Sequence, residues 1–136
     1  MKAFIDTNIL LDVLAAREPF YSDSANVWTL AEQGAVLGQV SAVSFRDIFY
    51  IVRKWGNEKT ARKALILVRD AFTPVACDAL VINQAIESGL ADFEDAVQYF
   101  CAVHAKTDCI VTRNPDDFPD DSVIPVLNPG EFMVGE

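Results

Sequence analysis

Four aspartates occupy positions that a purely solvent-exposed acid would not take. Each stands at an end of an expected helix or strand, or interrupts an apolar segment; the four are Asp6, Asp47, Asp95 and Asp117. Two unit charges about 5 Å apart repel by about 3 kcal/mol at an effective dielectric constant of 20. Carboxylates gathered in one pocket therefore need protonation or a divalent cation. Because the chain has one histidine and no CxxC spacing, an all-oxygen site for Mg²⁺ or Mn²⁺ is the chemistry that these residues favour.

Each acid also has a structural interpretation. Asp6 could cap a helix that starts at Asn8, Asp47 could be a half-exposed helix acid beside Arg46 or Lys54, and Asp92 has capping-box spacing to Asp95. The remaining acids of the PDDFPDD stretch read as a solvated loop, and they are Asp116, Asp120 and Asp121. The residues alone therefore leave both an acidic pocket and ordinary capping open.

The net charge of the chain argues against some nucleic-acid-binding functions. The 136-residue chain carries a formal charge of −9, which argues against a sequence-blind nucleic-acid coat protein. Six of its eleven Lys and Arg residues fall within eighteen positions, namely Arg46, Arg53, Lys54, Lys59, Arg62 and Lys63. That cluster is either a solvated helix surface or a basic rim on an acidic protein. Metal ions that activate water and stabilise a phosphoryl transition state would allow an acidic protein to cleave phosphodiesters.

The elements that must position these acids alternate along the chain. Strand-like stretches are expected at 2–6, 36–40, 73–77, 108–112 and 124–127. Helical patterns are expected at 8–15, 20–33, 42–55, 58–71 and 78–89 and from Asp92 onward, with Ser41 or Ser44 as cap of the third and a closing turn at 129–133. Alternation of this kind predicts an α/β fold, a parallel sheet of four to five strands covered by helices on both faces. Functional groups collect beyond the carboxyl ends of such strands, where Asp6 stands.

Length and composition give expectations about domain number, localisation and cysteines. The length fits one domain over residues 1–136. We expect a cytoplasmic protein without a membrane segment or secretory signal, because the first apolar segment is broken by Asp6 and Asp12. Cys77, Cys101 and Cys109 are expected as buried or half-buried thiols.

Four stretches together are more specific than any single acid. FIDTNILLDVL, SAVSFRDIFYIV, DFEDAVQYFCA and IVTRNPDDF occur in this order across nearly the whole chain. The chain thereby resembles the PIN domain family, in the branch with a DFEDA helix start and a TRNxxDF loop. That resemblance implies a three-layer α/β/α fold and a metal-dependent endoribonuclease that leaves a 5′-phosphate and a 3′-hydroxyl. Many members of the family are VapC-like toxins of type II toxin–antitoxin pairs.

The resemblance also implies roles for individual residues. A Mg²⁺ or Mn²⁺ site would be made by Asp6 and Asp95 as direct ligands, with Asp47 and Asp117 binding through water or holding a second ion. Around them, Asn8 would position the first acid, and Thr112 and Asn114 would line the pocket. Asp92 is expected beside them as the helix cap that its spacing to Asp95 predicts. Candidates for the RNA backbone path are Arg46, Arg53, Lys54 and Arg113.

Two positions depart from the commonest pattern. The second acid is Asp47 where the family usually has Glu, and Asn114 replaces the usual Asp. A neutral amide adds no charge, so it stays open whether the site holds one metal or two. The fourth acid is either Asp116 or Asp117, and Asp117 is preferred because it precedes Phe118 as the DF ending requires.

Partners and competing functions complete the expectations. RNA is the expected substrate, with a cognate antitoxin protein and a second copy of the chain as partners. The aromatic residues that could supply such a surface, or else pack in the core, are Phe45, Phe49, Tyr50 and Trp55. The alternative function is a PIN-like RNA- or protein-binding module with weak or no catalysis. A phosphatase of the haloacid dehalogenase type is disfavoured because Asn8 occupies the place of its second acid.

Overall fold

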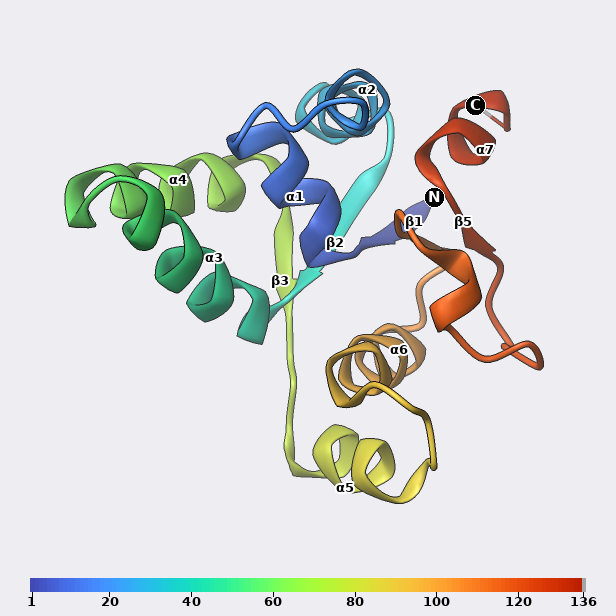
Figure 1. Cartoon of the computed structure of the whole chain (residues 1–136). Coiled ribbons are helices and arrows are strands. Elements are labelled where there is room, and N and C mark those ends of the chain that lie inside the picture. The colour runs from blue at the N-terminus through green and yellow to red at the C-terminus, as the bar shows by residue number, and fades with distance from the viewer. Residues whose placement is uncertain (136) are drawn as a thin grey trace.

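A parallel β-sheet lies between two layers of helices in a computed structural model that describes residues 1–135 (Figure 1). The strands are β1 (Lys2–Ile5), β2 (Leu37–Ser41), β3 (Thr73–Val75), β4 (Cys109–Val111) and β5 (Val126–Leu127). The helices are α1 (Thr7–Leu14), α2 (Tyr21–Glu32), α3 (Ala42–Trp55), α4 (Glu58–Ala71), α5 (Ala79–Glu87), α6 (Phe93–Ala105), the 3₁₀ turn η1 (Pro115–Asp117) and α7 (Pro129–Val134). The expected three-layer α/β/α architecture with a five-stranded sheet is confirmed.

Strand order places β1 at the centre of the sheet. The order is β3-β2-β1-β4-β5, and all four pairings are parallel. Ala3 is in register with Gly38 of β2 on one side and with Cys109 of β4 on the other. The chain therefore builds one half of the sheet outward from β1 and then returns to build the other half. The crevice beyond the carboxyl end of such a central strand is where parallel sheets place their ligand sites.

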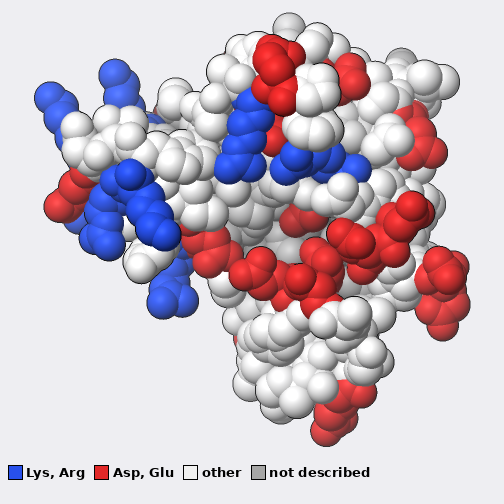
Figure 2. Space-filling model, viewed as in Figure 1, with Lys and Arg blue, Asp and Glu red and all other residues white. Residues whose placement is uncertain are grey.

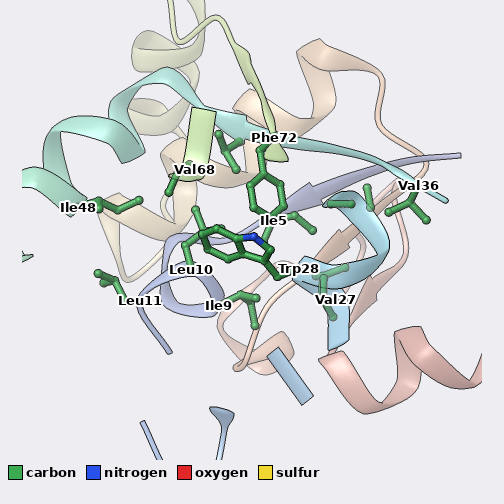
Figure 3. Close-up of a cluster of buried hydrophobic side chains, with 14 of the residues drawn as sticks. Ile5, Ile9, Leu10, Leu11, Val27, Trp28, Val36, Ile48, Val68 and Phe72 are labelled. Carbon is green, nitrogen blue, oxygen red and sulfur yellow. The ribbon is translucent and has the colours of Figure 1, made fainter. Parts of the chain in front are cut away.

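Alternating residues of β1 separate two hydrophobic cores. Ile5 faces a core shared with α1, α2, α3 and α4, whereas Phe4 faces a second core formed with α5 and α6. Trp28 lies in the middle of the first core and meets Phe72 edge to face, with ring centroids 5.0 Å apart (Figure 3). A side chain at Gly38 would collide with Phe72, since a Cβ there would lie 2.6 Å from its ring. Phe72, at the end of α4, and Ala31 of α2 can pack this closely on β2 because position 38 carries no side chain.

Most expected element boundaries agree with the structure within two residues, and the differences have local causes. The first helix starts at Thr7, because Asp6 takes the N-cap position. Ser41, not Ser44, caps α3 by accepting the Val43 N–H at 3.3 Å. The strand expected at 73–77 stops at Val75, and the strand expected at 124–127 is reduced to 126–127.

The aromatic residues of α3 divide between core and surface. Phe45 and Phe49 pack against the first core, as the packing interpretation held. Tyr50 and Trp55 are 58% and 48% exposed. Cys101 and Cys109 are buried and Cys77 is half-buried, as expected. Within residues 1–135, no helix is both long and apolar enough to cross a membrane.

Candidate metal centre

Asp6 is held rigidly at the carboxyl end of β1. One carboxylate oxygen, Oδ1, accepts the Thr7 N–H at 2.8 Å and the Gln98 Nε2–H at 3.0 Å, and Oδ2 accepts the Thr112 hydroxyl at 2.8 Å. The residue is only 6% exposed. The two interpretations of Asp6 are therefore compatible, since the same carboxylate caps α1 and faces the crevice. Hydrogen bonds from several donors compensate a carboxylate for the loss of water on burial, and they also fix its orientation.

Gln98 and Ser44 extend this hydrogen-bonded arrangement to neighbouring helices. Gln98 also donates to Thr7 Oγ1 at 3.2 Å, and Thr7 Oγ1 shares a 2.8 Å hydrogen bond with Ser44 Oγ. Sequence reasoning missed Gln98 and considered Ser44 only as a cap. The available signal was spacing, because Gln98 is one helical turn after Asp95 and thus on the same face of α6.

Asp95 lies close to several other carboxylates. Its backbone N–H donates to Asp92 Oδ1 at 3.1 Å, so Asp92 is the N-cap of α6 as expected. Burial, then the charges of Asp92, Asp6, Asp117 and Glu94, raise the pKa of Asp95 to about 7. Repulsion of this kind requires that Asp6, Asp95 and Asp117 share one electrostatic environment. The structure thus places Asp6 and Asp117 near enough to Asp95 for their charges to act on it.

Asp47 reaches the same cavity from α3. The cavity has a volume of about 760 Å³, and its walls include Asp6, Asp47 and Asp95. Burial raises the pKa of Asp47, and the charge of Arg46 partly opposes that rise. Asp47 therefore shares this cavity wall with Asp6 and Asp95, and Arg46 is the charged residue that acts on it.

Asp117 borders a second, smaller hollow beside the first. The lining of this hollow of about 420 Å³ includes Asp92, Asp95, Asp116, Asp117 and Asp120, so Asp95 belongs to both cavities. Asp117, in η1, is the acid of the pair that acts on Asp95. Figure 2 shows the result as a band of acidic side chains along one edge of a depression in the surface. Asp116 lines the same hollow, so the preference for Asp117 as the fourth acid stays a prediction.

The two asparagines have different contacts from those expected. Asn8 Oδ1 accepts the backbone N–H of Arg113 at 3.4 Å, so Asn8 ties α1 to the loop after β4. Positioning of Asp6 is instead the work of Thr112 and Gln98 in the part of the chain that the structure describes. Asn114 is exposed and donates its backbone N–H to Thr112 Oγ1 at 3.3 Å.

The basic candidates lie at different distances from the acids along α3 and the β4–η1 loop. Arg46 lines the larger cavity, whereas Arg53 and Lys54 lie further along the helix and pack over the Tyr50 ring at 5.5 and 6.0 Å. Arg113 follows Thr112 directly and is half-buried. Of the four basic candidates, Arg46 lines the acidic cavity, and Arg113 is tied to α1 through its backbone N–H, which Asn8 Oδ1 accepts.

Sequence reasoning missed Asp12, which is fully buried on α1. It accepts the Ser24 hydroxyl at 3.4 Å and pairs with Arg113 Nε at 3.4 Å and Arg17 Nη1 at 3.9 Å. Burial raises the pKa of Asp12, and Arg113, Arg17 and Ser24 act against that rise. The signal in the sequence was an acid inside the apolar run ILLDVL.

The donor set fits a hard divalent cation by its chemistry. Every candidate ligand is a carboxylate, and a cation would relieve the repulsion that raises the pKa of Asp95. As placed in residues 1–135, no three His, Cys, Asp or Glu side chains are already close enough together to hold a metal ion. The fit therefore rests on oxygen chemistry and shared electrostatics, not on a preformed cage.

A family model described as PIN domain matches residues 2–116. The chain belongs to the PIN domain family. A comparison with curated protein sequences finds no match. Solved structures that share the fold include VapBC2 from Rickettsia felis bound to a promoter DNA fragment, with 16% identity, a TM-score of 0.66 and coverage of 94% of this chain and 98% of that one.

Two further structures have the same fold at low identity. A toxin–antitoxin complex from Klebsiella pneumoniae is 20% identical, with a TM-score of 0.67 and coverage of 93% of this chain and 97% of that chain. VapC20 from Mycobacterium tuberculosis, described as a sarcin–ricin loop cleaving toxin, is 13% identical, with a TM-score of 0.63 and coverage of 79% and 86%. At these identities the likeness establishes the shared PIN fold.

Proposed function

We propose that this PIN domain protein is a metal-dependent endoribonuclease and the toxin of a type II toxin–antitoxin pair. The observation that carries the proposal is the placement of Asp6, Asp47 and Asp95 around one cavity at the carboxyl edge of the sheet, where burial and then the charges of Asp92, Asp6, Asp117 and Glu94 raise the pKa of Asp95 to about 7. Such crowding is costly for the metal-free protein, and a structural role gives no reason to keep it. Membership of the PIN family and the fold shared with VapC20 add support.

The carboxylates have separate roles in this proposal. Asp6 and Asp95 would hold Mg²⁺ or Mn²⁺ directly, and Asp47 and Asp117 would complete the site or hold a second ion. When bound, the metal supplies an activated water and stabilises charge on the phosphate. Thr112 and Gln98 keep Asp6 in one orientation.

RNA cleavage with matched variants tests the proposal. We expect a labelled single-stranded RNA to be cut in Mn²⁺ or Mg²⁺ and to stay intact in EDTA. Asp6→Asn should lose activity at least as severely as the 10–100-fold typical for removing a metal-supporting partner. Asp121→Asn removes the same charge from an exposed loop residue and should retain activity. Undiminished cleavage by a well-folded Asp6→Asn protein would overturn the assignment.

The competing function is a PIN-like module that binds RNA or protein without cutting. The observation that favours it is Asn114, whose neutral side chain supplies no charge where the family usually has an acid. Calorimetric titration separates the two functions: Mn²⁺ binding below millimolar concentration supports the nuclease, and its absence supports the binding module.

An antitoxin and a second copy of the chain are the proposed protein partners. The VapBC2 and Klebsiella structures are toxin–antitoxin assemblies with the same fold. Exposed Tyr50 and Phe93 belong to the cavity wall next to the acids, where a partner could cover them. Co-purification with the product of a directly adjacent gene, and light scattering of the purified chain, test these two assignments.

A further inference from the structure

Two arginines from distant parts of the sequence converge on the buried carboxylate of Asp12. Arg17, in the loop after α1, and Arg113, in the loop after β4, approach it at 3.9 and 3.4 Å. Asp12 is fully buried, while the Arg17 and Arg113 side chains are 35% and 24% exposed. The carboxylate is therefore an internal anchor, and the two arginine side chains are partly exposed.

Each arginine also packs on an aromatic ring. The guanidinium carbon of Arg113 is 4.1 Å from the centroid of the Phe20 ring, and that of Arg17 is 5.1 Å from the centroid of the Trp55 ring. Phe20 and Trp55 are 37% and 48% exposed. Stacking and the shared anchor fix both cations in place before any ligand arrives. We call Asp12, Arg17, Phe20, Trp55 and Arg113 the two-arginine platform.

The platform is connected to the acidic site through Arg113 and α1. Arg113 directly follows Thr112, whose hydroxyl donates to Asp6. The backbone N–H of Arg113 donates to Asn8 Oδ1. Asp12 is six residues after Asp6 on the helix that Asp6 caps, about 9 Å along the axis. Figure 2 shows basic side chains across the depression from the acidic band. An RNA strand that crosses the depression would thus meet acidic side chains on one side and basic side chains on the other.

The arginines retain capacity for another ligand. Two guanidinium groups share one carboxylate, so the platform has a surplus positive charge. A guanidinium offers five N–H donors, and no side-chain hydrogen bond from either arginine occurs within the described residues. Asp12 Oδ1 and Arg113 Nε are buried without a hydrogen-bond partner in that same part of the chain. Internal pairing therefore orients the arginines without using their exposed donors.

We infer that the two-arginine platform binds phosphates of the RNA backbone next to the acidic site, with the exposed faces of Phe20 and Trp55 available for base stacking. The inference rests on the proposed ribonuclease function and assigns it a substrate path. Paired guanidinium groups match phosphate geometry. Aromatic faces take bases without sequence preference. Asp12 acts as a positioning residue, since it touches the arginines and not the RNA.

Binding without cleavage tests the platform. The probe is a fluorescein-labelled oligouridylate of about 12 nucleotides, within the range of ~4–16 for single-strand sites, and anisotropy is read in EDTA from about 50 to 200 mM salt. Arg17→Gln and Arg113→Gln should each weaken binding about tenfold. Each should also make the slope of log K against log salt less steep by about 0.7. Arg69→Gln is the matched control on exposed α4, where Arg69 pairs with Asp70, and it should bind like the parent.

Asp12→Asn distinguishes positioning from overall charge. This variant makes the platform more positive, so charge alone predicts tighter binding, whereas loss of the anchor predicts weaker binding. Tighter binding by a folded Asp12→Asn protein would refute the positioning role. Arg113→Lys keeps the charge and should keep the salt slope if Arg113→Gln proves unfolded.

The outcomes for the platform and for the ribonuclease are separable. A parent that binds RNA through the two arginines but does not cut it supports the platform and overturns the proposed function. A parent that cuts RNA while both glutamine variants bind like Arg69→Gln overturns the platform alone. A parent that does not bind the oligonucleotide overturns the platform as well.

Discussion

Replacement of Asp95 by Asn should stabilise the metal-free protein above neutral pH. Burial and neighbouring acids raise the pKa of Asp95 from 3.8 to about 7. Folded protein therefore holds this proton up to about pH 7, whereas the unfolded chain releases it near pH 3.8. Raising the pH through that window favours the unfolded state, so the contribution of Asp95 to stability falls from about pH 4 to pH 7. Asn carries no titrating proton and escapes this loss.

The size of the effect follows from the shift. About 3 pKa units at about 1.4 kcal/mol per unit give a ceiling of about 4 kcal/mol. Asp95 is half-buried, so water screens part of the repulsion. Screening reduces the expected gain to about 1–2 kcal/mol, which corresponds to about 3–8 °C in Tm for a chain of this length.

Urea unfolding in EDTA at pH 5 and pH 8 measures this gain. The advantage of Asp95→Asn over the parent should grow between the two pH values, and added Mn²⁺ should stabilise the parent more than the variant. Asp121→Asn, in an exposed loop, controls for the change in net charge and should show no such growth. Equal stability of variant and parent at both pH values would refute the claim that the acids repel one another.

Two other substitutions test the supports of the site and of the first core. Thr112→Val removes the buried 2.8 Å hydrogen bond to Asp6. It should lower the free energy of unfolding by about 1–3 kcal/mol in urea titrations, while Thr112→Ser, which keeps the hydroxyl, should cost less. Gly38→Ala places a Cβ 2.6 Å from Phe72 and should cost about 1–3 kcal/mol by overpacking; a thermal melt unchanged from the parent would contradict that contact.

Local patterns were sufficient to predict the elements and the sheet. Helical and strand periodicities depend on burial of one face, and that burial is visible in the spacing of apolar residues. Asp6 was predicted at a strand end because an acid there breaks the local pattern. Asp92 was predicted as a helix cap by spacing, and its side chain accepts the backbone N–H of Asp95 as a cap does.

Contacts between distant residues were beyond prediction from the sequence. Gln98 reads as an ordinary helix residue, and its bond to Asp6 spans 92 positions. Asp12 was visible as an acid in an apolar run, but its partner Arg113 comes from the far end of the chain. These pairings depend on how two elements approach each other, which neither local propensity nor periodicity encodes.

The central place of β1 has a consequence for the order in which the protein is made. Its register with β2 joins Lys2 to Leu37, but its register with β4 joins Ala3 to Cys109, more than a hundred residues later. A ribosome that has finished α4 has produced Asp6 and Asp47 and neither Asp95 nor Asp117. Contacts of such long range form late. A chain terminated after α4 therefore carries two of the four predicted site acids and cannot form the complete crevice. The acidic centre forms only when synthesis is nearly finished.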